Sequence, residues 1–331
     1  MGNIAVTVPF RCNNVKELEN MVRTEFANVR VSPIEENTYF LAHISALLAD
    51  AYRIIIDGDC QAEIILMPTN FGFVNFKYEV DERDLNACVS TCEHYVCGIE
   101  NLIQNGMAED TIEKRILSAL EKTGDVIGKK CYWMFNFYMD SSKLSDSHIF
   151  KLRHLDEHNM EVNGKYDDRN ELDGIFEFSK GHKCYISTKF VGLELREDRF
   201  KELEEVVKYI FILLQHERMM LIDFKKRIIE HEKKENRKYK KLKTEILECL
   251  SKYTFETVSD STVCQNIYMQ YRRLWNLSEM EATMQDLIFT LNDEIAKRNE
   301  RKIMVFTVVM TAAGVVSFIA DGWAVWEKIF T

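Results

Sequence analysis

The order of apolar and polar positions predicts alternating strands and helices from residue 1 to about residue 195. Residues 52–56 and 62–67 are apolar, β-branched runs on either side of Asp57-Gly58-Asp59, a sequence typical of a hairpin turn. Residues 73–80 alternate, with Asn75, Lys77 and Glu79 on the polar side. This pattern predicts an antiparallel strand with one face buried and one face in water. Further strands are expected at 3–8, 130–139, 175–178 and 185–195.

Helices are expected between these strands. Asn14 precedes an amphipathic stretch. Glu17 lies three residues after Asn14, which is the arrangement of a capping box. Two further helices are expected over residues 84–105, ending at Gly106, and over 109–121, ending near Gly124. Because helices and strands alternate, residues 1–195 are predicted to form a cytosolic α/β (or α+β) domain with a mixed sheet.

Residues 196–302 are predicted to form a long antiparallel helical hairpin and stalk. The sequence contains neither proline nor glycine from Glu197 to Tyr253, and only the polar stretch Thr257 to Ser261 favours a turn. A second helix is then expected to run from about Asp260 without interruption. Its apolar residues keep near-heptad spacing from Ile267 to Ile295, which is typical of a coiled coil. Since a lone hairpin of this length buries little apolar surface, a homo-oligomer is expected.

The segment 303–331 contains an uncharged, proline-free apolar run from Ile303 to Ala320. A helix needs roughly 20 apolar residues to cross a bilayer, and this run, extended by Trp323 and Trp326, has that length. Four basic residues precede it: Lys297, Arg298, Arg301 and Lys302. The pattern predicts a transmembrane helix with the N-terminal bulk of a single-pass membrane protein in the cytosol. The alternative is a helix buried in a protein core.

Composition and charge add few constraints. The chain has 331 residues and a formal net charge of −10, which argues against nucleic-acid binding over the whole surface, so no DNA partner is expected. Its nine cysteines are odd in number and lack the spacing of a disulfide framework, so free thiols are expected. The first residues have the pattern of a strand, and no N-terminal signal peptide is expected.

Candidate catalytic and metal-binding motifs are weak. Cys88, Cys92, His94 and Cys97 are close in sequence, but on a helix His94 and Cys97 would point away from the two other thiols. Packed thiols are therefore favoured over a zinc site. The segment His154 to His158 has the H-x-x-E-H spacing of some zinc peptidases, yet a solvated charged segment is the preferred interpretation. Phosphate-loop and nucleophile-elbow motifs are absent from the sequence. We therefore expect neither an enzyme nor a resident cofactor.

A basic stretch between Lys225 and Lys243 is the one strong charge anomaly. Its ten basic residues are accompanied by only three glutamates. The default interpretation is a solvated helix face. The alternative is an anion-binding site for a nucleotide, a nucleic acid or an acidic lipid, of which the lipid is the least favoured. The candidate anion-binding residues are Lys233, Lys234, Arg237, Lys238 and Lys241.

The order of an α/β domain, long helices and a stalk entering an apolar C-terminal helix resembles the CorA family of cation channels. The resemblance reaches individual residues around Asn292 to Gly322, where a polar stalk sequence leads into Ile303-Met304-Val305-Phe306-Thr307. The family ends this helix with a Gly-Met-Asn motif, and here the matching residues are Gly322-Trp323-Ala324. The resemblance implies an oligomeric ion channel with a divalent cation and a nucleotide as candidate ligands. Because the Met and Asn of the motif are absent, a ligand-gated pore or membrane effector is expected rather than a housekeeping magnesium transporter. Diverged CorA-like proteins of type III CRISPR systems imply a nucleotide-activated effector in antiviral defence.

Three functions are therefore compared. The first is a ligand-gated pore, for which one helical face carries the candidate pore-lining residues Thr307, Thr311, Gly314, Phe318 and Asp321. Simple packing of these small residues against another helix is the alternative role. The second function is a tail-anchored, non-conducting scaffold that recruits partners through the helical hairpin. The third is a membrane-tethered enzyme, which has the least support.

Overall fold

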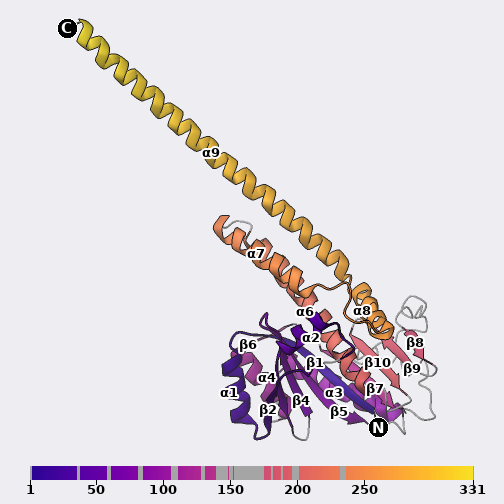
Figure 1. Ribbon diagram of the computed structural model, residues 1–331. Helices are drawn as coiled ribbons and strands as arrows, with labels where there is room; N and C mark the ends of the chain where they lie inside the picture. The colour runs from indigo at the N-terminus through magenta and orange to yellow at the C-terminus, as the bar shows by residue number, and fades with distance from the viewer. Residues whose placement is uncertain are drawn as a thin grey trace, which may run out of the picture. The chain divides into compact units, whose positions relative to one another are not determined.

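The computed structural model describes most of the chain (Figure 1). The described residues are 2–35, 38–57, 61–80, 85–105, 111–127, 131–138, 148, 152, 175–179, 182–187, 189–195, 201–231 and 236–330. They form two compact units, Met1–Met220 with Tyr253–Leu277 and Leu221–Lys252 with Ser278–Thr331. This division differs from the predicted boundaries at 195 and 302, because the larger part of one long helix and a short later helix belong to the first unit.

The first unit is built on one mixed sheet, which confirms the predicted α/β class. In the described residues its strands follow the order β2-β3-β4-β5-β1-β7-β10-β9-β8, and β6 pairs with β1. Pairing is antiparallel except between β7 and β10, which are parallel. The strands are β1 (Gly2–Cys12), β2 (Val29–Ser32), β3 (Tyr52–Ile56), β4 (Gln61–Leu66), β5 (Phe71–Val80), β6 (Gly124–Val126), β7 (Tyr132–Tyr138), β8 (Ile175–Ser179), β9 (His182–Ile186) and β10 (Phe190–Leu195).

The main core lies on one face of this sheet. Every second residue of β1, beginning with Ile4 and ending with Cys12, is fully buried. Those side chains pack against three helices, α1 (Val15–Glu25), α3 (Leu85–Asn105) and α4 (Ile112–Thr123). Asn14 caps α1 by accepting a hydrogen bond from the Glu17 backbone at 3.2 Å, as the capping box predicts. Alternation along the strands therefore fixes which face receives these helices.

The opposite face of the sheet is covered by α6 (Lys201–His231), which corrects the prediction of a water-exposed polar face on β5. Asn75 on that face is only 4 % exposed. Hydrogen bonds from Asn3 on β1 and Lys77 on β5 both reach Glu204 on α6, at 3.3 and 3.0 Å. Alternation alone predicts water on this face, because it carries no information about a helix that follows more than a hundred residues later.

The predicted helical hairpin is also corrected. In place of one uninterrupted first helix, the structure has α6 and α7 (Asn236–Tyr253). In place of one second helix, it has α8 (Thr262–Leu274) and α9 (Leu277–Phe330). The break lies at Asn276, whose φ of 50° is left-handed and cannot continue an α-helix. Residues 185–195, predicted as one strand, form β9 and β10, and a short helix α2 (Ala42–Ala49) was not predicted.

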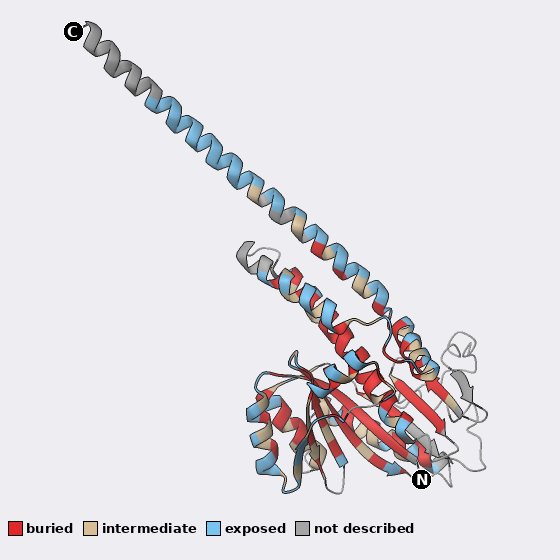
Figure 2. Ribbon diagram, viewed as in Figure 1, coloured by how far each residue is buried: buried red, intermediate tan, exposed pale blue. Residues whose placement is uncertain are grey.

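The second unit contains the end of α6, α7 and most of α9. Arg227 on α6 donates two hydrogen bonds to the Glu245 carboxylate on α7, at 2.6 and 2.7 Å. Both helices bury apolar residues, and α9 buries Met284 and Ile288 near its start. Further along α9 most described side chains are exposed, and from Glu300 to Ser317 all of them are (Figure 2). The large apolar residues there are 53 to 68 % exposed, including those from Ile303 to Val316.

The predicted transmembrane helix is contradicted. Among the residues that the structure describes, no helix combines the length and apolarity that crossing a membrane requires. This finding overturns the predicted C-terminal membrane segment, the single-pass membrane location and the membrane and ion-channel assignment.

Candidate functional site

The residues predicted to line a pore lie on α9, and the structure does not bring them into a site. Thr307 and Thr311 are exposed, and each hydroxyl donates at 2.8 Å to the backbone carbonyl four residues earlier. A Cβ added to Gly314 would meet nothing within 4 Å. The side chains of Phe318 and Asp321 lie outside the described residues. The two hydroxyl hydrogens are therefore used within the helix itself.

The predicted anion-binding residues are described only in part. Lys233 and Lys234 lie outside the described residues, as do the side chains of Arg237 and Lys238. Lys241 is exposed on α7. Hydrogen bonds from Arg227, together with the charge of Lys241, hold the pKa of the Glu245 carboxyl below its usual range. The anion site on this basic stretch stays a prediction.

The cysteine and histidine motifs show no metal-binding geometry in the described part of the chain. Cys88 and Cys92 are both buried on α3, whereas His94 is exposed. Among the described residues, no three His, Cys, Asp or Glu side chains are grouped so that they could hold a metal ion. The segment His154 to His158 lies outside those residues.

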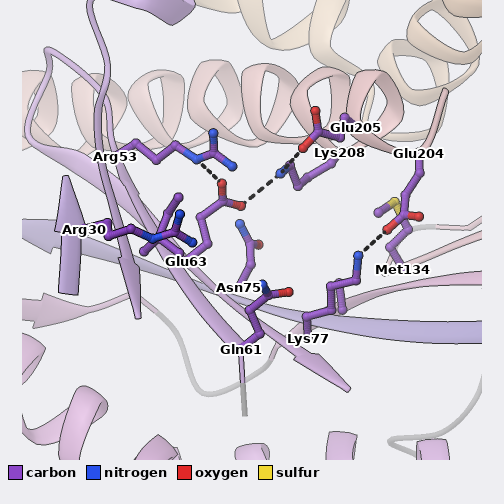
Figure 3. A pocket seen from close by; sticks show the side chains of 12 residues that line it. Arg30, Arg53, Gln61, Glu63, Asn75, Lys77, Met134, Glu204, Glu205 and Lys208 are labelled. Carbon is purple, nitrogen blue, oxygen red and sulfur yellow. Dashed lines mark hydrogen bonds and ion pairs between the residues drawn. The ribbon is translucent and has the colours of Figure 1, made fainter. Parts of the chain in front are cut away.

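A polar cluster that the sequence did not single out lies on the α6 face of the sheet (Figure 3). Strand register builds it in two rows. Glu63 on β4 lies opposite Asn75 on β5, which in turn lies opposite Thr7 on β1. In the next row, Gln61, Lys77 and Ala5 are paired in the same way. Side chains two residues apart on a strand share a face, so both rows point towards α6.

Ion pairs connect these rows to β3 and α6. Glu63 accepts from Arg53 Nε on β3 at 2.5 Å and from Lys208 Nζ on α6 at 3.0 Å (Figure 3). Their side chains are 13 to 18 % exposed, so the three charges are largely removed from water. Lys208 also lies 3.8 Å from Glu205, which is 58 % exposed.

Each charge in this cluster shifts the pKa of its neighbours so that they stay ionised. Burial by itself would raise the pKa of Glu63, but the positive charges of Lys208 and Arg53 outweigh burial and hold that pKa below its usual value. For Lys208 both effects have the opposite sign. Burial would lower its pKa, but the Glu63 carboxylate outweighs burial and raises that pKa above its usual value. The Glu63 carboxylate raises the pKa of Arg53 in the same way. All three groups therefore stay ionised across the physiological pH range.

A cavity of about 250 Å³ lies among these side chains. Asn75 lines it and carries a donor that is not satisfied. Its Oδ1 accepts from the Thr7 hydroxyl at 2.6 Å, while Nδ2 is buried and has no hydrogen-bond partner among the described residues. A buried polar atom without a partner is unfavourable by roughly 1 to 3 kcal/mol. An unsatisfied amide facing a cavity indicates a site that a ligand or water completes.

One sequence signal could have located this site. Asn75 and Lys77 were assigned to a water-exposed face, and Arg53 and Glu63 stood as isolated polar residues within the apolar runs of a predicted hairpin. The register of that hairpin pairs Arg53 with Ile65 and Ile55 with Glu63, so it places Arg53 and Glu63 on one face as diagonal neighbours. It carries no information about the residues of α6.

The geometry thus joins a buried ion cluster, a cavity and an unsatisfied amide donor within the first unit. Comparison adds no relative to this description: the chain matches no family model, no curated protein and no solved structure.

Proposed function

We propose that the first unit is a binding domain for a small polar ligand, which occupies the cavity between the sheet and α6. One observation carries this proposal, the buried and unpartnered Nδ2 of Asn75 at the cavity wall. A volume of about 250 Å³ accepts a small metabolite or one polar group of a larger molecule. This cavity lies in a different part of the chain from the basic stretch for which the sequence predicted an anionic ligand.

Binding fits this cavity better than acid–base catalysis. A group that transfers protons works best with a pKa near the operating pH. Here the pKa of Glu63 is lowered and those of Arg53 and Lys208 are raised, so each group moves away from neutrality. These charges are suited to holding a ligand in place by charge and hydrogen bonds.

The position of α6 supports a ligand-responsive role. Glu204, Glu205 and Lys208 on this helix line the cavity. The same helix continues past Met220 into the second unit, where Arg227 pairs with Glu245 on α7. A ligand that alters the packing of α6 therefore acts on an element that both units share.

Filling the cavity is expected to abolish ligand binding. Ala5 lines the cavity on β1, and Ala5→Leu would occupy part of that space with its larger side chain. A ligand that binds only the folded state raises the melting temperature. In a thermal-shift screen of anionic, cationic and neutral metabolites, we expect hits with the wild-type chain and none with Ala5→Leu.

The matched control is Ala49→Leu, because Ala49 is exposed on α2 and does not line the cavity. It should keep every hit of the wild-type chain. Hits that persist in Ala5→Leu would place the binding site elsewhere, and a screen without any hit would oppose the proposal.

Exposed apolar residues on α9 favour a second proposal, self-association through this helix. Its large side chains from Ile303 to Val316 are each more than half exposed. Contiguous apolar surface of this kind marks an interaction site, and parallel copies of α9 would bring identical runs to the same height. Light scattering of the full chain should show an oligomer.

Val309→Glu with Val316→Glu should shift that oligomer towards smaller species, because the new carboxylates would face one another between copies. Thr283→Glu with Thr290→Glu, on the polar part of α9, is the matched control. A wild-type monomer, or equal mass in all three proteins, would contradict self-association through this run.

A further inference from the structure

The hydrogen-bonding groups around the cavity select for one kind of ligand. Both oxygens of Glu63 are occupied, one by Arg53 and one by Lys208. Both oxygens of Glu204 are occupied as well, by Lys77 and Asn3. The four carboxylate oxygens of Glu63 and Glu204 are therefore already satisfied by the protein, and Glu205, the third carboxylate of the lining, lies 3.8 Å from Lys208.

The donors at the wall have spare capacity. Nδ2 of Asn75 is unpartnered. Arg53 uses Nε for Glu63, and the structure describes no residue that accepts from its two Nη groups. Lys77 can donate three hydrogen bonds, and among the described residues it donates only to Glu204. A ligand that completes this site must supply acceptor atoms.

Charge does not oppose this type of ligand. Four cationic and three carboxylate side chains line the cavity, and the fourth cation, Arg30, pairs with Asp57 at 2.8 Å, so the formal charges balance. Arg53 and Lys77 approach the cavity from β3 and β5, and Asn75 lies between Glu63 and Lys77 (Figure 3). A guanidinium with free Nη groups matches the oxygen spacing of a carboxylate or phosphate.

We propose that the cavity binds an oxyanion, a phosphate or carboxylate group of a small molecule, through Asn75 Nδ2, Arg53 Nη and Lys77 Nζ. This inference rests on the proposed binding function and specifies the class of ligand. An oxyanion would satisfy the orphaned amide hydrogen and the free donors of Arg53 and Lys77. A cationic ligand would leave the amide unsatisfied, and two of the three carboxylates that it meets, Glu63 and Glu204, already accept hydrogen bonds at both oxygens.

Isothermal titration of the full chain with pyrophosphate, citrate and spermidine tests this inference. We expect pyrophosphate, citrate or both to bind, and spermidine not to bind. Pyrophosphate alone would identify a phosphate group as the ligand, and citrate alone a carboxylate. Ala5→Leu should abolish the binding.

The decisive variant is Asn75→Asp, which keeps the size of the side chain but replaces the donor with an anionic acceptor. We expect it to weaken oxyanion binding at least tenfold. Asn20→Asp makes the same change at an exposed position of α1 and should leave the affinity unchanged. Because Lys77 is 42 % exposed, Lys77→Gln should fold normally, and it should weaken binding several-fold without disturbing the buried cluster.

The outcomes separate the two proposals. If only spermidine or a neutral compound binds, and Ala5→Leu abolishes that binding, the oxyanion inference is overturned while the binding function stands. Oxyanion binding that is unaffected by Asn75→Asp and Lys77→Gln would also overturn the inference. If no compound of any charge binds the wild-type chain, both proposals fail.

Discussion

Glu63→Ala should lower the free energy of unfolding of the first unit by about 3 to 5 kcal/mol, the range measured when one partner of a buried ion pair is removed. Glu63 holds two cations, Arg53 at 2.5 Å and Lys208 at 3.0 Å. Both cations are at most 18 % exposed, so neither regains its full hydration when the carboxylate is lost. Hydrogen exchange of the β4 and β5 amides reports this change within the first unit.

The matched control is Glu25→Ala, which also breaks an arginine–glutamate pair. Arg115 and Glu25 are 3.2 Å apart but 36 and 47 % exposed, so water replaces the lost contact. This variant should lower the free energy of unfolding by about 1 kcal/mol or less. Equal losses in the two variants would show that the Glu63 cluster is not buried in solution.

Acidification should weaken the fold through His216. This side chain is 1 % exposed on α6, contacts the Thr69 hydroxyl, and packs its ring against Phe71 and Tyr253. Burial lowers the pKa of His216 from 6.5 to about 3. The unfolded chain therefore binds a proton near pH 6.5, whereas the folded chain keeps the imidazole neutral until far lower pH.

The sign of the effect follows from this difference in protonation. His216 does not penalise folding above pH 6.5, and stability is lost progressively as pH falls from 6.5 towards 3, by roughly 4 kcal/mol in total. About 2 kcal/mol of this loss should occur between pH 6.5 and 5, where carboxylates are still ionised. Denaturant unfolding at pH 7, 6 and 5 measures it.

His216→Gln should flatten the profile in this window, because it removes the titrating group and keeps a polar side chain beside Thr69. His43→Gln, at an exposed position on α2, should retain the slope of the wild-type chain. A wild-type profile that is flat between pH 7 and 5 would contradict the burial of a neutral imidazole.

Local sequence signals predicted the part of the fold that depends on neighbouring residues. The Asn14 cap, the β3–β4 hairpin and the alternation of β5 each arise from interactions within a few residues or across one turn. Propensity also explains the errors in the helical region. Residues around Asn276 contain neither glycine nor proline, and the asparagine itself, a residue that favours the left-handed conformation after a helix, was the one local signal of the break.

The candidate site could not be predicted because it depends on packing between distant segments. Asn75 and Glu204 belong to elements separated by more than a hundred residues, and the polar face of β5 is indistinguishable in sequence from a solvated one. Lys77 and Glu63 line a cavity only because α6 packs over this face of the sheet and contacts both side chains.

The apolar run of α9 led to a wrong prediction, because its composition was interpreted without knowledge of the fold. Its composition alone favoured a membrane segment, and among the described residues no helix satisfies that requirement. Exposure of Ile303 and its apolar neighbours instead places a large unpartnered surface on the second unit.

The most direct test of the binding site is the side-chain amide signal of Asn75 in a nuclear magnetic resonance spectrum. Selective ¹⁵N-asparagine labelling of the full chain, with Asn75→Asp for assignment, isolates this resonance. Titration with pyrophosphate and citrate should move it saturably with at least one of them, and Ala5→Leu should abolish the movement. A stationary Asn75 resonance at saturating concentrations of both would contradict oxyanion binding in the cavity.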